Sequence, residues 1–279
     1  MTVAQAEIDS GQRFSFGKNW ASFLKTLDAD RIDIAVASLR ELLGVDSLQG
    51  RTFLDIGCGS GLFSLAARRL GARVTSFDFD ADSVDCAQQL RARFDPAPEN
   101  WTIQQGSALS FEFFQQLGKF DVVYAWGVLH HTGQMWQALN LAGQAVRPGG
   151  LLAIAIYHDQ GWRSRAWLRV KQIYCSGPLG RWLMKAVFYP WFALRAGLVS
   201  LIRGQNEFTG YRRRRGMSIT HDWADWLGGL PYEVASYQQL IDFFEARGFS
   251  LRRGRPTRRL GCHELTFQAA THSTHEPTG

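Results

Sequence analysis

The sequence has few cysteines and no apolar leader segment, and each absence excludes a class of protein. The 279 residues include four cysteines, whose spacing matches neither a disulfide framework nor a zinc site. Residues 1–14 contain no apolar run of the kind that forms a signal peptide. We therefore expect a reduced, cytoplasmic protein, and we expect no bound metal ion.

Acidic residues are scarce in the C-terminal half of the chain. The net charge is +6 overall, yet residues 160–260 hold 18 Lys and Arg against 6 Asp and Glu, and the rest of the chain is net acidic. An anionic partner should therefore dock on the C-terminal half. The alternative is a basic face that contacts only water.

Two common phosphate-binding motifs are absent, although residues 54–61 read LDIGCGSG. The spacing Gly57-x-Gly59-x-Gly61 fits neither the Walker loop nor the dinucleotide fingerprint. Glycine at this density indicates a tight turn or a close approach to a ligand, here where helix amides would face that ligand. Asp78 follows 17 residues later, at the end of the next predicted strand, where a carboxylate can accept hydrogen bonds from ribose hydroxyls. The pattern favours a ligand that contains a nucleoside.

Short apolar segments alternate with helical patterns along most of the chain. This alternation predicts βαβ units and a parallel sheet. A last helix, with Ser236 as its cap and Gly248 past its end, precedes a predicted β-hairpin. The predicted strands are residues 51–56, 73–79, 101–106, 120–126, 151–157, 249–255 and 262–268. The predicted helices are residues 30–44, 62–72, 81–94, 134–146 and 236–248, with a cap at Asp80 or Asp82 for the third.

Four motifs in a fixed order carry a resemblance to a known family. LDIGCGSG, VTSFDFD, FDVVYAWGVLHH and RPGGLLAIAIY together resemble the class I S-adenosylmethionine-dependent methyltransferases, over roughly residues 50–157. Within that family the chain looks most similar to the small-molecule branch that includes the ubiquinone-pathway O-methyltransferases. The resemblance implies an α/β, Rossmann-like, doubly wound mixed seven-stranded sheet with a terminal antiparallel hairpin and a helical insert.

The resemblance also implies the domain organisation and the cofactor site. We expect one methyltransferase domain over residues 1–279, in which 1–48 form a flap and helix, 49–158 the cofactor-binding core, 159–230 a helical and basic insert, and 231–270 the terminal helix and hairpin. Asp55 and the glycine loop would hold the methionine end of S-adenosylmethionine, Asp78 the ribose and Phe79 the adenine. Ser107 stands where many members have an acidic residue for the adenine amine. The expected cofactor-binding residues are Asp55, Gly57, Cys58, Gly59, Gly61, Asp78, Phe79, Ser107 and Trp126.

The chemistry expected from this cofactor is methyl transfer to a small molecule, most plausibly to oxygen on a bulky apolar or anionic metabolite. A sulfonium methyl is already activated, so the enzyme mainly aligns the acceptor, and a hydroxyl acceptor gains from a histidine base. His131, after the fourth strand, and His221 are the candidate bases, with a structural role as the alternative for each.

Other functions stay open. The alternatives are methylation of nitrogen or sulfur, methylation of RNA, and a non-catalytic protein that only binds the cofactor. A nucleic acid is not the expected partner, because the run AWGV after the fourth strand differs from the Asn/Asp-Pro-Pro-Tyr-like run of amino-methylating enzymes of this fold.

Residues 161–215 are the least family-like segment. They predict two aromatic helices and then four consecutive arginines at 212–215, and Lys185, Pro190 and Arg195 interrupt the longest apolar stretch, which argues against a transmembrane helix. The segment is a lid over the acceptor, a peripheral membrane contact or an oligomer surface, and the oligomeric state stays open.

Two other aromatic segments have two readings each. Residues 13–24 are either a flap that closes over the site or simple packing. Trp223, Trp226, Pro231 and Tyr232 either line an acceptor pocket or form an aromatic plug against the sheet.

Overall fold

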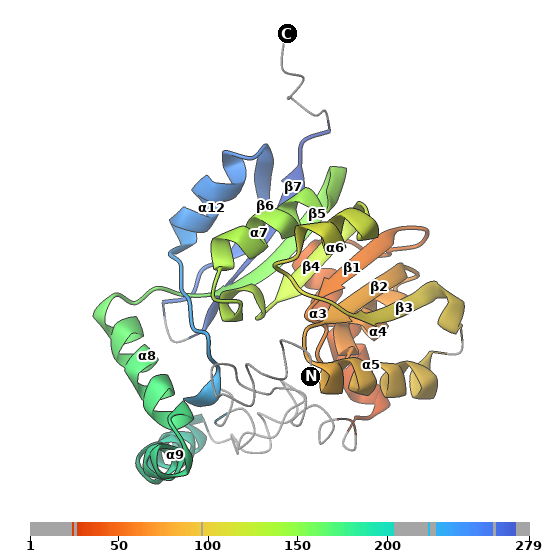
Figure 1. Cartoon of the computed structure of the whole chain (residues 1–279). Coiled ribbons are helices and arrows are strands. Elements are labelled where there is room, and N and C mark those ends of the chain that lie inside the picture. The colour runs from red at the N-terminus through yellow and green to blue at the C-terminus, as the bar shows by residue number, and fades with distance from the viewer. Residues whose placement is uncertain are drawn as a thin grey trace.

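Among the described residues, seven strands form one sheet (Figure 1). They are β1 (Thr52–Ile56), β2 (Arg73–Asp78), β3 (Trp101–Gln105), β4 (Phe120–Trp126), β5 (Val146–Tyr157), β6 (Phe249–Arg255) and β7 (Cys262–Ala269). Their order in the sheet is β3-β2-β1-β4-β5-β7-β6. The first five pair in parallel, and β7 is antiparallel to both of its neighbours, which confirms the predicted mixed sheet with a terminal hairpin. The structure is a computed structural model, and it describes residues 24, 27–95, 97–203, 223, 227–258 and 261–271.

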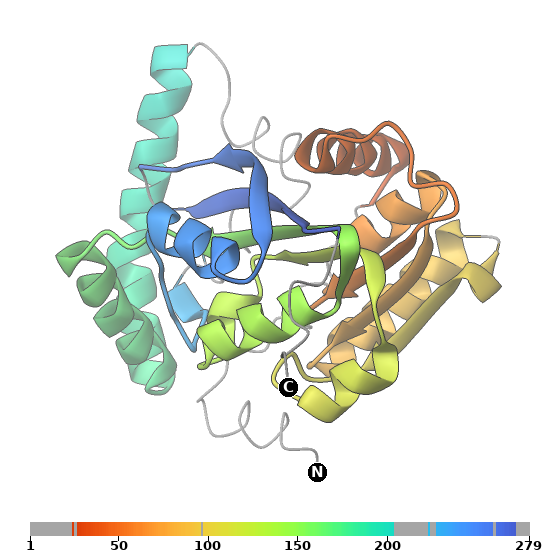
Figure 2. The ribbon, with the colours of Figure 1, turned by 90° about the horizontal axis from the view of Figure 1, so that it is seen from above.

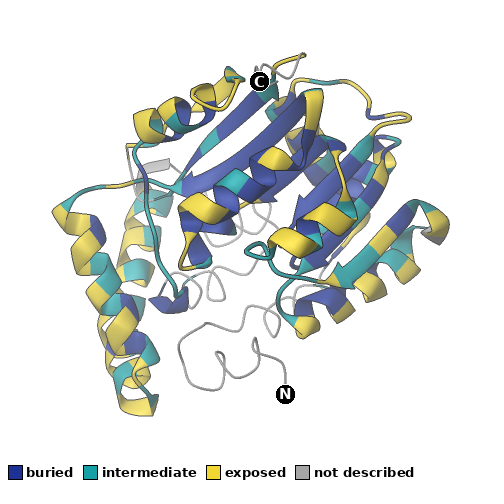
Figure 3. Ribbon diagram, turned by 45° about the horizontal axis from the view of Figure 1, so that its top comes forward, coloured by how far each residue is buried: buried dark blue, intermediate teal, exposed yellow. Residues whose placement is uncertain are grey.

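Helices cover both faces of this sheet (Figures 1 and 2). They are α3 (Ala29–Leu43), α4 (Leu62–Arg69), α5 (Ala81–Phe94), α6 (Phe111–Leu117), α7 (Met135–Gln144) and α12 (Tyr237–Glu245), with short 3-10 turns η1 (Pro98–Asn100) and η2 (Leu129–His131). Leu39 of α3, Leu65 of α4 and Leu90 of α5 belong to the core on one face. Leu139 of α7 and Phe244 of α12 belong to the core on the other face. The buried residues concentrate in the sheet between these two layers (Figure 3).

Local sequence signals determine where the helices begin and end. The side chain of Asp28 caps α3, and Gly44 ends it in the left-handed region at φ +66°. Asp80 caps α5. Ser236 and Gln239 form a reciprocal capping box at the start of α12, which confirms the cap predicted there.

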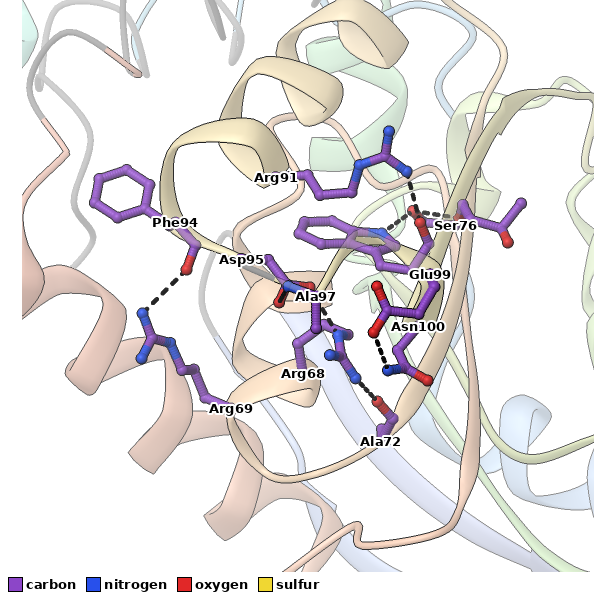
Figure 4. Close-up of polar contacts among 12 residues, drawn as sticks. Arg68, Arg69, Ala72, Ser76, Arg91, Phe94, Asp95, Ala97, Glu99 and Asn100 are labelled. Atoms are coloured by element: carbon purple, nitrogen blue, oxygen red, sulfur yellow. Dashed lines mark hydrogen bonds and ion pairs between the residues drawn. The ribbon is translucent and has the colours of Figure 1, made fainter.

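A polar network fastens β2 and β3 to the helices that cover them (Figure 4). The buried indole of Trp101 donates its N–H to Oγ of Ser76 at 2.8 Å. The backbone carbonyl oxygen of Trp101 accepts a hydrogen bond from the side chain of Arg91 at 2.7 Å. Arg68 of α4 forms an ion pair with Asp95, after the end of α5, at 2.8 Å. The strand that carries Ser76 is therefore held rigidly where it enters the carboxyl edge of the sheet.

Two helices, α8 (Trp162–Cys175) and α9 (Pro178–Arg203), form a pair outside the sheet, as the aromatic pattern predicted (Figure 2). Tyr174 and Met184 form the buried contact between them. Trp223, within the predicted insert, packs against α9, with its ring centroid 5.4 Å from that of Phe192. Pro190 lies inside α9, which continues through it. Within the described ranges, no helix combines the length and apolarity needed to cross a bilayer.

The carboxyl ends of β1, β2, β4 and β5 lie at one edge of the sheet, because these strands are parallel and adjacent. Open α/β sheets bind their ligands at this edge. The predicted N-terminal flap, His221, Trp226 and the arginines 212–215 lie outside the described residues.

Candidate active site

The loop between β1 and α4 is built on glycines in the left-handed region. Gly57, Gly59 and Gly61 have φ values of +67°, +53° and +80°, which L side chains rarely adopt. A Cβ on Gly57 would lie 2.5 Å from the side chain of Val128. The loop therefore packs closely against the segment that follows β4.

Most amides of this loop bond within the protein. Gly57 and Cys58 donate to the carbonyl oxygen of Phe77 at 2.8 and 3.0 Å, and Gly61 donates to that of Cys58 at 2.8 Å. Gly59 donates to the carboxylate of Asp78 at 2.9 Å. These four amides therefore tie the loop to β2 and to itself.

Two carboxylates flank the loop. Asp55 is 2% exposed and accepts the hydroxyl hydrogen of Ser64 at 2.6 Å. The two oxygens of Asp78 accept the amide hydrogens of Gly59 and Asp80 at 2.9 and 3.0 Å. Burial raises the pKa of Asp55 to about 7, with the charge of Asp78 adding to the shift, and burial raises the pKa of Asp78 to about 6. A cation or a hydroxyl donor bound here would favour the ionised forms.

An aromatic row borders Asp55 on the α4 side of the sheet. The ring of Phe63 stacks on Tyr124 at 5.3 Å and on Trp126 at 6.4 Å between centroids. Tyr124 lies in register with Asp55, and its buried hydroxyl has no hydrogen-bond partner within the described part of the chain. Burial raises the pKa of Tyr124 well above its usual value, so the phenol stays protonated. Of these three aromatics, only Trp126 was among the residues expected to bind the cofactor. The signal for Tyr124 was its position two residues before Trp126 on β4, and Phe63 had none.

His131 lies at the same edge, in the turn η2 after β4. Its Nδ1 is 2.6 Å from the carbonyl oxygen of Pro231, a contact that requires the hydrogen on Nδ1, so that in the neutral ring the lone pair lies on Nε2. The ring of Tyr157 stands at 89° to the imidazole, 5.4 Å away. His131 is thus held in the tautomer that a general base needs.

The segment after Pro231 secures this turn. The amide of Glu233 donates to the carbonyl oxygen of His130 at 3.0 Å. Its carboxylate accepts the amide hydrogen of Met135 at 3.0 and 3.1 Å, at the start of α7. This contact places a negative charge at a helix N-terminus, where it is stabilising. Pro231, one of the residues predicted to line an acceptor pocket, is therefore close to the candidate base.

A buried cluster next to His131 was not indicated by the sequence. The side chains of His130 and Lys171 are fully buried, and Nζ of Lys171 lies 5.1 Å from the ring centroid of Tyr232. The ring of Tyr232 is 5.4 Å from that of Tyr157. Burial, together with the charges of His131 and Lys171, lowers the pKa of His130 well below its usual value, so this imidazole stays neutral. The cluster joins α8 to the carboxyl edge.

The other predicted cofactor residues surround the same edge. Oγ of Ser107 accepts the amide hydrogen of Leu109 at 3.2 Å, in the turn after β3. The carbonyl oxygen of Phe79 accepts a hydrogen bond from Gln105 at 2.9 Å. Burial and the nearby carboxylates raise the pKa of the Cys58 thiol well above its usual value, so it stays neutral.

The remaining described histidines near this edge are paired with each other. Nε2 of His263 lies 2.9 Å from Nδ1 of His158, and Nδ1 of His263 accepts the amide hydrogen of Thr257 at 3.1 Å. His158 therefore belongs to the junction of β5 and β7. In the described residues no three His, Cys, Asp or Glu side chains gather in a group that could hold a metal ion.

Comparisons with known proteins agree with this geometry. Residues 54–152, from β1 into β5, match the family model described as Methyltransferase domain. A ubiquinone biosynthesis O-methyltransferase from Methylobacterium sp. (strain 4-46) is 37% identical over 117 residues, 42% of this chain and 45% of the relative. Another, from Caulobacter vibrioides, is 31% identical over 113 residues, 38% of this chain and 41% of the relative. The chain spans about half the length of the curated relatives it matches.

A solved structure shares the fold over nearly the whole chain. The magnesium protoporphyrin IX methyltransferase from Synechocystis PCC 6803 with bound S-adenosylmethionine matches with a TM-score of 0.56 and 14% identity, over 97% of this chain and 98% of that chain. Residues 54–152 carry the class I S-adenosylmethionine-dependent methyltransferase domain that the family model and the curated relatives indicate, and the solved structure shares the fold. Its curated relatives are ubiquinone biosynthesis O-methyltransferases, and S-adenosylmethionine is the cofactor that the domain implies.

Proposed function

We propose that this chain transfers the methyl group of S-adenosylmethionine to an oxygen atom of a small-molecule acceptor. The observation that carries the proposal is the presence, at one sheet edge, of the carboxylates Asp55 and Asp78 and of His131 with its lone pair on Nε2. Oxygen is favoured because a histidine base assists a hydroxyl acceptor and because the curated relatives are O-methyltransferases.

The carboxylates suit this cofactor. When bound, it supplies a methyl group on a positively charged sulfur, already activated toward a nucleophile. Asp55 is assigned to the cationic methionine end, and each oxygen of Asp78 keeps a lone pair for a ribose hydroxyl besides the one used by an amide. The glycine loop 57–61, including Cys58, gives the close backbone approach that the methionine end requires. Phe79 and Ser107 are assigned to the adenine, and Trp126 to the methionine side.

His131 is assigned the role of base. As the acceptor oxygen bonds to the methyl carbon, the hydroxyl proton passes to Nε2, and the carbonyl oxygen of Pro231 stabilises the imidazolium that forms. Tyr157 and Tyr232 would contact the acceptor, which suits a bulky apolar or anionic metabolite. His221 remains a second candidate base, outside the described residues. The same proposal treats the chain as one domain, in which residues 159–230 form an insert on the acceptor side of the site.

Methyl-labelled cofactor tests the proposal. The protein is incubated with labelled S-adenosylmethionine and fractionated small-molecule extracts, and the labelled product is identified by mass spectrometry. A methyl group on oxygen supports the proposal. A methyl group on nitrogen, sulfur or RNA would overturn the choice of acceptor but keep methyl transfer. Normal binding of S-adenosylhomocysteine with no turnover in any extract would instead indicate a protein that only binds the cofactor.

A further inference from the structure

Helix α9 is apolar on two sides, and within the described part of the chain one side packs against α8 whereas the other is exposed. Met184, Phe188 and Phe192 face α8 and belong to the buried contact between the two helices. The opposite side exposes eight large apolar residues, each between 45% and 81% exposed. These residues, named here the α9 stripe, are Leu179, Trp182, Leu183, Val187, Trp191, Leu194, Leu198 and Leu201.

The α9 stripe is continuous along one side of the helix. Apart from the step from Trp182 to Leu183, its members follow one another at steps of three or four residues, a spacing that keeps side chains on the same helical face. From Leu179 to Leu201 the stripe is about 33 Å long at the rise of an α-helix. Single exposed apolar residues are normal on a protein surface, whereas a contiguous stripe marks an interaction site.

The helix pair that carries the stripe has no acidic residue. Residues 161–203 contain eight Lys and Arg and no Asp or Glu. The exposed bases among the described residues of α8 and α9 are Arg163, Arg165, Arg169, Arg181 and Arg195. The partner should therefore combine an apolar layer with negative charge, which an anionic lipid bilayer does. A second copy of this chain fits less well, because it would oppose positive charge with positive charge.

The geometry of α9 suits a helix that lies on a bilayer. Within the described ranges no helix could span one, and Pro190 and the bases of α9 set it apart from a membrane-spanning segment. Trp182 and Trp191 lie within the stripe, and tryptophan favours the boundary between headgroups and acyl chains. The long stems of arginine and lysine let their charges reach lipid phosphates from the side of such a helix.

We propose that α9 docks on an anionic lipid bilayer, with the α9 stripe buried at the headgroup boundary and the exposed arginines of α8 and α9 near the lipid headgroups. The docking does not depend on the proposed methyl transfer. It would place the bilayer beside α8, which begins at Trp162, shortly after β5 leaves the candidate active site at Tyr157.

Vesicle sedimentation tests the docking. The full chain is mixed with phosphatidylcholine vesicles with and without phosphatidylglycerol, over a range of salt concentrations. We expect sedimentation with the anionic vesicles at low salt and release as salt rises, because exposed charges are screened. The double variant Arg165→Gln with Arg169→Gln should bind the anionic vesicles more weakly, by about fivefold for each arginine. No sedimentation with anionic vesicles at low salt would overturn the proposal.

A matched pair of variants tests the stripe itself. Leu194→Gln with Leu198→Gln should weaken binding by at least about tenfold, because two apolar side chains no longer enter the bilayer. Ile34→Gln with Phe111→Gln, at 46% and 50% exposure on α3 and α6, should leave binding within about twofold. Equal losses in both variants would overturn the proposal. The proposal would also be overturned if light scattering showed that the wild-type protein is a dimer, that the stripe variant is a monomer, and that neither binds vesicles.

A measurement on the otherwise intact protein covers the case in which the stripe variant fails to fold. Brominated acyl chains should quench the tryptophan fluorescence of the bound protein, and Trp182→Phe should reduce that quenching while vesicle binding continues. Unchanged quenching would overturn the placement of the stripe. Titration with S-adenosylhomocysteine keeps the two proposals separate, because failure of docking leaves cofactor affinity intact.

Discussion

Oδ2 of Asp78 accepts the amide hydrogen of Gly59 at 2.9 Å, so the acid that ends β2 also shapes the loop that follows β1. Its other oxygen accepts the amide hydrogen of Asp80 at 3.0 Å. The same carboxylate thus holds the loop and is the assigned partner of the ribose.

Asp78→Ala should weaken S-adenosylhomocysteine binding by roughly 1–3 kcal/mol, because hydrogen bonds to the ligand and to the loop are both lost. Calorimetry measures the change, and NAD should not bind in the wild type. Asp82→Asn, at an exposed acid in the first turn of α5, is the control and should bind like the wild type. Binding of NAD without affinity for S-adenosylhomocysteine would contradict the assigned cofactor.

Cofactor affinity should fall as the pH is lowered from 8 to 6. The pKa of Asp55 is about 7 and that of Asp78 about 6, and the ammonium group and ribose hydroxyls of the ligand prefer the ionised carboxylates. Protonation of Asp55 alone should cost about tenfold in affinity at pH 6. Titrations with S-adenosylhomocysteine across this range measure the profile. Asp55→Asn should bind more weakly at pH 8 and show a flatter profile, and an equally steep one would argue against Asp55 as the titrating group.

His131→Ala should cut methyl transfer by about 10²–10⁴-fold with nearly unchanged affinity for S-adenosylhomocysteine, because the base is lost and the cofactor site is not. The control is His158→Asn, since His158 follows β5 at the same edge but is bonded to His263. Its rate should stay close to that of the wild type. A fully active His131→Ala protein would mean that alignment alone drives the reaction or that the nucleophile is not a hydroxyl.

The free energy of unfolding should fall as the pH drops from about 6.5 toward 4, in part because of His263. Burial first, and then the charge of His158, lowers the pKa of His263 from 6.5 to about 4. The unfolded chain therefore binds a proton in this range that the folded chain excludes, so the stabilising effect is present above pH 6.5 and is lost toward pH 4. The contribution is roughly 1–3 kcal/mol. Urea unfolding at several pH values should show a shallower decline for His263→Gln, and an unchanged slope would exclude this histidine as the cause.

Much of the fold and part of the site could be predicted from local sequence. The alternation of apolar and helical segments, the cap at Ser236 and the glycine at position 44 are short-range signals, and each element follows from a few neighbouring residues. The glycine loop and Asp78 were found for the same reason. The resemblance to a known family then implied the mixed seven-stranded sheet with its terminal hairpin, which local patterns do not contain.

The rest depends on contacts between distant parts of the chain. The hydrogen bond between His131 and Pro231 joins residues 100 positions apart, so no local pattern indicates which nitrogen keeps the lone pair. In the sequence, Lys171 is one base among several on α8. Its burial beside the ring of Tyr232 becomes visible only in the fold. Apolar residues occur on more than one side of α9, and only the fold determines which side α8 covers. The shifted pKa values of Asp55 and Asp78 arise from burial, which composition does not reveal.

The place of β7 in the sheet has a consequence for synthesis on the ribosome. β5 ends at Tyr157, but its outer edge pairs with β7, which ends at Ala269. A growing chain therefore keeps that edge unpaired while roughly one hundred further residues emerge, and exposed strand edges recruit other chains. A chain that stops before Cys262 would carry the glycine loop, Asp78 and His131, yet it would present an open strand and should aggregate. Only chains that have been synthesised as far as β7 can therefore pair the outer edge of β5 and complete the sheet.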